Sequence, residues 1–245
     1  MAIKQVDNSI YEELGDRWYT AYDDPIALLR AENKVKTPWI VERIRKNNLS
    51  GSSVLDVGCG AGFLSNELAR QQFKVTGVDL SPDSLRVARK FDETHTVDYQ
   101  VADAYQLPFA DETFEVVTAL DFLEHVDDPA LVIKEFSRVL KPGGLFFFHT
   151  FNRSPLTHLV VIKLVEWLVK NTPKDMHVID LFITPKELTE YCRTAKMQVK
   201  EMSGIRPVFT SIPISSLFSG VVSKSMRFTL TSSLAMSYLG FAKKI

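Results

Sequence analysis

The sequence predicts an α/β protein in which a mostly parallel sheet of seven strands carries helices on both faces. Two observations favour this fold. Short runs rich in Val, Phe and Leu alternate with amphipathic helical patterns, and several of the helical patterns begin with a capping side chain followed by proline. A chain of 245 residues suits one α/β domain with insertions. We therefore expect residues 1–245 to form a single domain.

Seven segments are expected to form the strands. The first five are rich in Val, Phe and Leu, as strands buried on both faces are. They span residues 53–57, 74–79, 97–103, 114–121 and 145–150, and the two later strands span residues 198–205 and 235–243.

Helix starts are marked by a side chain that can accept a backbone hydrogen bond, placed before a proline at the first helical position. Before one of these prolines, Thr184 also has Glu187 three residues after it, which is the spacing of a capping box. Apolar residues then recur at helical spacing on one side, which predicts packing against a core. The three starts are Ser81-Pro82, Asp128-Pro129 and Thr184-Pro185.

Segments outside this alternation divide the domain further. Residues 1–50 are rich in aromatic side chains and are expected to form a helical cap over one edge of the sheet. Residues 51–151 form the cofactor-binding core, residues 152–183 an insertion after the fifth strand, and residues 184–245 a C-terminal helix and strands. Residues 206–234 are serine-rich and show no clear period. Substrate choice is expected in these segments, because the scaffold itself is generic.

Composition excludes several classes of protein. Apolar residues make up 45% and charged residues 24% of the chain, which is typical of globular proteins. The net charge of −1 provides no basic excess for nucleic acid. Two cysteines, Cys59 and Cys192, and the lack of an apolar leader predict a reducing, cytoplasmic location. The most apolar stretch, residues 156–169, is shorter than the ~20 residues of a membrane span.

A glycine-rich loop follows the first strand and predicts a ligand site. Gly58, Gly60 and Gly62 alternate there, and glycine lets the backbone turn tightly and approach a ligand. Dinucleotide folds use a different spacing, G-x-G-x-x-G. Asp56 stands two residues before the first glycine, where a carboxylate would repel a pyrophosphate. The loop therefore favours a ligand that carries a positive amino group, with a plain strand-to-helix turn as the alternative.

The ends of the next two strands suggest the rest of that ligand. Asp79 ends the second strand, where a carboxylate can accept both hydroxyls of a ribose, and Leu80 follows it. Asp103 and Ala104 end the third strand and are placed to border an adenine ring. Together these residues indicate an adenosine that bears an amino acid.

These motifs resemble the class I S-adenosylmethionine-dependent methyltransferases, which have a Rossmann-like sheet. Four later motifs are similar to those of the ubiquinone-biosynthesis O-methyltransferase family, which methylates a ring hydroxyl of demethylubiquinone and of an earlier polyprenyl catechol. The resemblance implies that Gly58, Asp79 and Leu120 line the cofactor, and that Lys36 replaces a basic residue that touches its carboxylate. The later motifs are Leu123-Glu124-His125-Val126, Leu140-Lys141-Pro142-Gly143-Gly144, Asn152-Arg153, and Pro173-Lys174 followed by His177.

Asp121, Glu124 and His125 are the candidate catalytic residues. Their spacing predicts one face of a helical turn, where two carboxylates and an imidazole can hold a divalent cation that acidifies a catechol. In the family this triad binds Mg²⁺, although its first member is usually Glu. The alternative is a metal-free site in which Asp121 caps the turn, Glu124 completes a capping box and His125 serves as general base. His149 and His177 are further candidates for the substrate pocket.

The sequence therefore predicts an S-adenosylmethionine-dependent O-methyltransferase acting on a lipophilic catechol of ubiquinone biosynthesis. Two alternatives stay open: methylation of another small molecule, and a non-catalytic binding protein. Residues 156–170 predict a wide apolar helical face with Trp167, which suits either a membrane surface or packing within the protein. Peripheral membrane contact, a homo-oligomer or a biosynthetic complex are the partners expected; nucleic acid is not.

Overall fold

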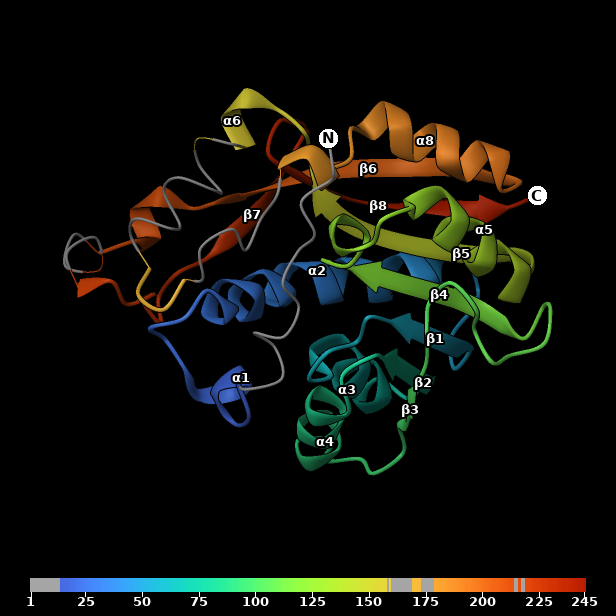
Figure 1. Cartoon of the computed structure of the whole chain (residues 1–245), viewed down its shortest axis with the longest axis horizontal. Coiled ribbons are helices and arrows are strands. Elements are labelled where there is room, and N and C mark those ends of the chain that lie inside the picture. The colour runs from blue at the N-terminus through green and yellow to red at the C-terminus, as the bar shows by residue number, and fades with distance from the viewer. Residues whose placement is uncertain (1–13, 158, 160–168, 173–178, 214–215, 217–218) are drawn as a thin grey trace.

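The protein folds around one eight-stranded sheet with the strand order β3-β2-β1-β4-β5-β8-β6-β7 (Figure 1). The computed structural model describes residues 14–157, 159, 169–172, 179–213, 216 and 219–245. Strands β1 to β5 pair in parallel, whereas β8 and β6 pair antiparallel, so the α/β class is confirmed. The strands are β1 (Ser53–Val57), β2 (Lys74–Asp79), β3 (Asp98–Val101), β4 (Phe114–Leu120), β5 (Leu140–Phe151), β6 (Met197–Pro207), β7 (Phe228–Thr231) and β8 (Ser237–Lys244).

The prediction of seven strands is wrong by one. The eighth, β7, lies within the serine-rich segment 206–234 and pairs antiparallel with the end of β6, from Gly204 opposite Thr231 to Pro207 opposite Phe228. It has only four residues, none of them fully buried. A strand this short at the edge of a sheet has too little apolar pattern to be recognised from sequence.

The helices begin where the capping residues predict. Ser81 accepts a hydrogen bond from the Ser84 backbone, Asp128 accepts one from the Leu131 backbone, and Thr184 forms a complete capping box. The helices are α1 (Arg17–Thr20), α2 (Ile26–Lys46), α3 (Phe63–Arg70), α4 (Pro82–Lys90), α5 (Pro129–Val139), α6 (Pro155–Thr157) and α8 (Pro185–Thr194), with 3₁₀ turns η2 (Leu123–His125), η4 (Ile179–Leu181) and η5 (Phe209–Ser211).

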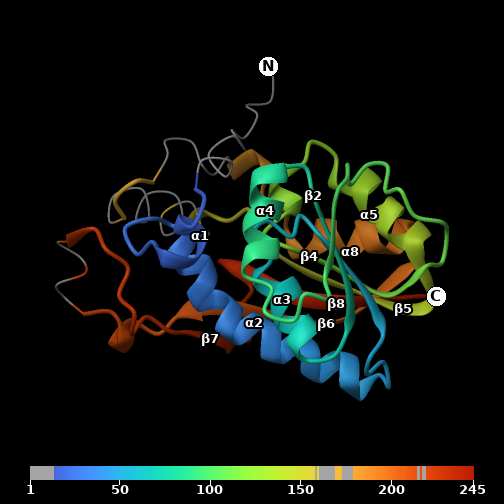
Figure 2. The same cartoon turned by 90° about the horizontal axis from the view of Figure 1, so that it is seen from below.

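Helices cover both faces of the sheet. On one face, Trp39, Ile40 and Ile44 of α2 share an apolar cluster with Leu64 and Leu68 of α3 and with strand residues; on the other, α5 and α8 pack over the sheet (Figure 2). The N-terminal helices were expected over an edge of the sheet, and for α2 this is wrong. Its apolar residues are continuous enough to bury against the sheet face itself, which places α2 beside the strand ends that form the site.

Strand order reverses between β1 and β4, as the fold class predicts. Loops on either side of such a reversal leave a crevice at the carboxyl ends of the strands. Cys59 and Cys192 are both free and buried. Among the residues that the structure describes, the helices are all too short or too polar to cross a membrane.

Candidate active site

A cavity of about 570 Å³ lies at the carboxyl ends of β1, β2 and β4. Its walls include the glycine loop, the strand ends, the turn η2, parts of α2, and described residues between Ile205 and Ser237. Most of the predicted site residues line it. They are Asp56, Gly58, Gly60, Asp79, Leu80, Asp103, Ala104, Leu120, Asp121, Glu124 and His125.

The glycine loop takes a shape that only glycine adopts easily. Gly58 has a φ of +66°, and a Cβ there would come within 2.3 Å of a ring carbon of Phe122. Gly62 has a φ of +79° and begins α3, where a Cβ would meet the Tyr99 hydroxyl at 2.3 Å. Gly62 does not line the cavity, so its role is to let the helix pack closely on β3.

Asp56 is a buried carboxylate that is hydrogen-bonded by two hydroxyl groups. The hydroxyls of Ser65 and Thr118 each donate to it at 2.6 Å. Burial outweighs these two hydrogen bonds and raises its pKa to about 6. A positively charged amino group in the cavity would offset that cost, because an opposite charge favours the ionised form.

Asp79 joins the end of β2 to the glycine loop. Its Oδ2 accepts from the Gly60 backbone N–H at 2.8 Å and its Oδ1 from the Ser81 backbone N–H at 2.9 Å. Each carboxylate oxygen retains a second lone pair for a ligand hydroxyl. Burial raises the pKa of Asp79 despite these bonds.

The wall expected for an adenine ring lies beyond β2 and β3. Leu80 is 69% exposed at the cavity rim and Ala104 is buried. Asp103 lies two residues past the end of β3, where its Oδ1 accepts from the Tyr105 backbone N–H at 2.9 Å. The wall is thus apolar, with an exposed carboxylate beside it.

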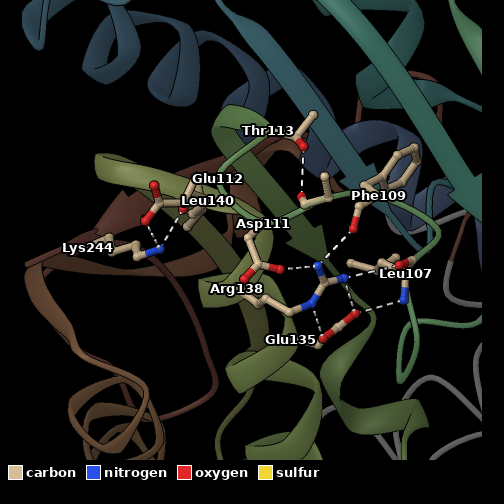
Figure 3. Close-up of polar contacts among 10 residues, drawn as sticks. Leu107, Phe109, Asp111, Glu112, Thr113, Glu135, Arg138, Leu140 and Lys244 are labelled. Atoms are coloured by element: carbon tan, nitrogen blue, oxygen red, sulfur yellow. Dashed lines mark hydrogen bonds and ion pairs between the residues drawn. The ribbon is translucent and has the colours of Figure 1, made fainter.

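Arg138 of α5 anchors the chain that continues from this wall (Figure 3). Its guanidinium donates to the carbonyls of Leu107 and Phe109 at 3.1 and 2.8 Å and pairs with Asp111 at 2.7 Å. Glu135 accepts from the Leu107 backbone N–H at 2.9 Å and from Arg138. These bonds fix the loop between β3 and β4, so that Ala104 has a defined place at the cavity.

Lys36 lies beneath the cavity and does not line it. Its side chain is fully buried, and its ammonium contacts Asp121 Oδ2 at 2.6 Å, Glu32 Oε2 at 3.0 Å and His149 Nδ1 at 3.3 Å. Burial alone would lower the pKa of Lys36, but the carboxylates of Asp121 and Glu32 outweigh it and raise that pKa. The ammonium is therefore charged and already paired, where a contact with the cofactor carboxylate was expected.

The predicted helical face of Asp121, Glu124 and His125 is not formed. The 3₁₀ turn η2 begins at Leu123, its cap is Phe122, and no side chain caps it. Asp121 stands before the turn with a φ of +53°, which interrupts the helical spacing. Both of its carboxylate oxygens are paired, Oδ2 with Lys36 and Oδ1 with His149 Nδ1 at 2.6 Å. The capping alternative for Asp121 is wrong for the same reason.

Glu124 and His125 face the cavity, and burial favours the uncharged form of each. Glu124 is 2% exposed, and its Oε2 accepts from the Thr150 hydroxyl at 2.8 Å. Its Oε1 is buried without a hydrogen-bond partner among the described residues. Burial and the charge of Asp121 raise the pKa of Glu124 to about 8, and burial lowers the pKa of His125 to about 4. Burial thus favours the uncharged form of both groups, and Glu124 loses its proton more readily as the pH approaches 8.

These residues do not fit the Mg²⁺ site that the resemblance implied. Both Asp121 oxygens face Lys36 and His149, away from a site shared with His125, and Glu124 Oε2 is bound by the Thr150 hydroxyl. Among the described residues, the group whose ligand atoms lie within 4.8 Å of one another is a different one, Glu32, Asp121 and His149. The Lys36 ammonium contacts all three of its members.

Sequence reasoning missed Glu32, and it missed the pairing of Lys36 and His149 with Asp121. Glu32 and Lys36 stand four residues apart on α2, a spacing that pairs opposite charges, and this signal could have linked them. No local signal connects His149 with Asp121. The serine-rich segment 206–234, where substrate choice was expected, contributes described residues such as Pro207, Met226 and Phe228 to the cavity wall. His177, with Pro173 and Lys174, lies outside the described residues.

Comparisons with known proteins identify the family and the fold. Residues 55–148 match the family model described as a methyltransferase domain. A ubiquinone biosynthesis O-methyltransferase of Xanthomonas campestris is 36% identical over 82% of this chain and 84% of its own length, and one of Pseudomonas putida is 38% identical over 80% and 84%. A solved S-adenosylmethionine-dependent methyltransferase of Methanosarcina mazei has the same fold, with a TM-score of 0.59 and 21% identity over 83% of this chain and 97% of its own.

The fold, the cavity at the strand reversal and these relatives point to one enzyme class. The chain belongs to the ubiquinone biosynthesis O-methyltransferase family and is an S-adenosylmethionine-dependent methyltransferase.

Proposed function

We propose that this enzyme transfers the methyl group of S-adenosylmethionine to a catechol-type hydroxyl of a lipophilic quinone precursor in ubiquinone biosynthesis. The observation that carries the proposal is the continuity of the cavity. It extends from the glycine loop, past Glu124 and His125, to an apolar wall between Ile205 and Ser237. A cofactor and a lipophilic acceptor fit in such a cavity with the reacting groups between them.

The apolar wall supports a lipophilic acceptor. It includes Phe209, Ile212, Val222, Met226 and Phe228. Phe209 is 66% exposed at its rim, where an apolar chain longer than the cavity can leave it. An acceptor that is only polar would gain nothing from burying this surface.

Glu124 supplies the proton acceptor in this proposal. The hydroxyl oxygen attacks the methyl carbon in line with sulfur; the O–CH₃ bond forms as the S–CH₃ bond breaks, and the bonding pair goes to sulfur. The phenolic proton passes to the unpartnered Oε1 of Glu124. A pKa of about 8 leaves part of Glu124 ionised close to neutral pH, and this ionised form is the general base. His125, neutral and also facing the cavity, can orient the hydroxyl.

We also propose that the enzyme contacts the membrane from which such a substrate comes. Leu156 and Leu159 are 45% and 59% exposed, near the start of the segment 156–170. Exposed leucines next to an apolar helical pattern suit the interface of a bilayer. Residues 160–168 of that segment lie outside the described part of the chain.

A methyl-transfer assay on demethylubiquinone analogues with and without an isoprenoid tail tests the function. We expect a methyl ether and S-adenosylhomocysteine as products. The analogue with the isoprenoid tail should have a higher kcat/KM than the analogue without it. The tail-free catechol serves as the matched control for the apolar wall. If the enzyme methylates other small molecules but no catechol, the proposal is overturned in favour of another methyltransferase activity. If it binds the cofactor but methylates nothing, a binding protein is favoured.

A further inference from the structure

The buried centre formed by Glu32, Lys36, Asp121 and His149 joins three elements beneath the cavity. Glu32 and Lys36 come from α2, Asp121 follows β4, and His149 belongs to β5. The side chains of Lys36 and His149 are fully buried, and those of Glu32 and Asp121 are only 10% and 15% exposed. Such a centre requires strong charge compensation, because unpaired charges are costly inside a protein.

The Lys36 ammonium is surrounded by side chains of the kinds that bind metal cations. Two carboxylates and an imidazole lie with their ligand atoms within 4.8 Å of one another. The Lys36 nitrogen contacts each of them, at distances from 2.6 to 3.3 Å. Carboxylate oxygens with one imidazole also form a set that binds divalent metal ions such as Mn²⁺. Glu32 and Asp121 line the cavity, so an ion from solvent has a route to the centre.

His149 provides a second, independent observation. Its Nδ1 lies 2.6 Å from Asp121 Oδ1, and its Nε2 is buried without a hydrogen-bond partner among the described residues. The imidazole is thus fully buried; Nδ1 faces Asp121 and Lys36, and Nε2, on the other side of the ring, is left without a partner among the described residues. This is an unusual cost for a purely structural cluster.

We propose that the Lys36 ammonium takes the place of a divalent cation at this centre, so that the methyl transfer proposed above needs no metal ion and loss of Lys36 opens a metal site on Glu32, Asp121 and His149. The inference rests on the proposed function only in its statement about methyl transfer. Lys36 then acts as a positioning residue: it holds Asp121 and His149 at the ends of β4 and β5, under the cavity that contains Glu124.

An ammonium and a metal ion differ in what they can do here. The ammonium is part of the Lys36 side chain, so it does not have to be bound from solution. Its contacts are made with protein side chains. It cannot also chelate the two oxygens of a catechol, as an ion with open coordination positions can. In this enzyme the acceptor therefore loses its proton to a side chain.

Mn²⁺ binding tests the inference without any substrate. The probe is Mn²⁺ alone, and the electron paramagnetic resonance signal of the free ion is followed as protein is added. We expect the wild-type enzyme to leave the signal unchanged and Lys36→Met to bind a single Mn²⁺ per chain. Lys34→Met, at an exposed position on the same helix, is the matched control and should bind none. Adding Asp121→Asn to Lys36→Met should abolish the binding.

Two results would overturn the inference: a wild-type enzyme that binds Mn²⁺ and loses it with Asp121→Asn, or a folded Lys36→Met that binds none. If Lys36→Met does not fold, the wild-type titration and its Asp121→Asn counterpart still decide. In the activity arm, wild-type turnover should be equal in chelator and in Mg²⁺, whereas Lys36→Met should regain turnover with added metal. Absence of turnover on every catechol refutes the proposed function and leaves the Mn²⁺ result to stand by itself.

Discussion

Asp79 Oδ2 accepts a hydrogen bond from the Gly60 backbone N–H at 2.8 Å, which ties the end of β2 to the loop that follows β1. The same carboxylate lines the cavity. One side chain therefore shapes the glycine loop and faces the place expected for the ribose.

Asp79→Ala should weaken binding of S-adenosylhomocysteine by about 1–3 kcal/mol, because hydrogen bonds to a charged acceptor are lost. Isothermal titration calorimetry measures the change. Asp83→Ala is the control, since Asp83 is an exposed carboxylate that pairs with Arg86 on α4. Full affinity in the Asp79 variant would mean that the ribose binds elsewhere.

Cofactor affinity should depend on pH through Asp56. Its pKa of about 6 means that below this pH the free protein holds a proton that must leave before the carboxylate can pair with a cationic amino group. Affinity should therefore fall with acidification below pH 6, by up to about tenfold per pH unit, and level off above it. Titrations at a series of pH values test this. The Asp56→Asn variant should bind the cofactor more weakly, and its affinity should not change with pH in this range. A wild-type affinity that does not change with pH would contradict the role given to Asp56.

Glu124 should control the pH dependence of turnover. A carboxyl with a pKa of about 8 accepts a proton only when ionised, so kcat/KM should rise with pH and level off above about 8. Glu124→Gln should reduce kcat by about 10²–10⁴-fold. Thr150→Val removes the hydrogen bond donated to Oε2 and should move the rise to higher pH. A Glu124→Gln enzyme with the wild-type rate and profile would refute the role.

Gly58→Ala should lower stability and cofactor affinity by more than the backbone strain of a positive φ alone would cause. The added Cβ would meet Phe122 at 2.3 Å. Gly143→Ala is a matched control, because Gly143 also has a positive φ, +77°, but its Cβ would come no closer than 3.8 Å to Lys243. The control should cost about 1–2 kcal/mol of stability. Thermal melts and cofactor titrations of both variants give the comparison, and equal losses would show that the contact with Phe122 relaxes freely.

Leu159→Glu should weaken binding to liposomes without unfolding the enzyme, since Leu159 is 59% exposed. Co-sedimentation with vesicles gives the readout. Leu131→Glu, at a leucine of α5 that is 54% exposed, is the control and should bind like the wild type. Unchanged sedimentation of the Leu159 variant would remove this residue from the membrane contact.

Local sequence signals predicted most of the fold. Proline after a capping residue placed α4, α5 and α8 at their observed starts, because caps act within one turn of the helix. The strands β1 and β2 match their expected bounds, since continuous apolar runs report burial on both faces. The short edge strand β7 has neither signal.

The site was harder to predict, because its decisive contacts are long-range. The spacing of Asp121, Glu124 and His125 indicated a helical face, but the left-handed φ of Asp121 breaks that spacing. Its side chain pairs instead with Lys36, 85 positions earlier in the chain. No periodicity encodes such a pairing, which arises only when the sheet brings the strand ends beside α2.

The burial of Lys36 has a consequence for how the protein is made. During synthesis α2 is made before the strands, so the Lys36 ammonium has only Glu32 on the same helix until Asp121 and then His149, 113 residues after Lys36, have been translated. Burying it earlier would leave a charge poorly matched in an apolar setting. We therefore expect α2 to dock late, once β5 has taken its place in the sheet.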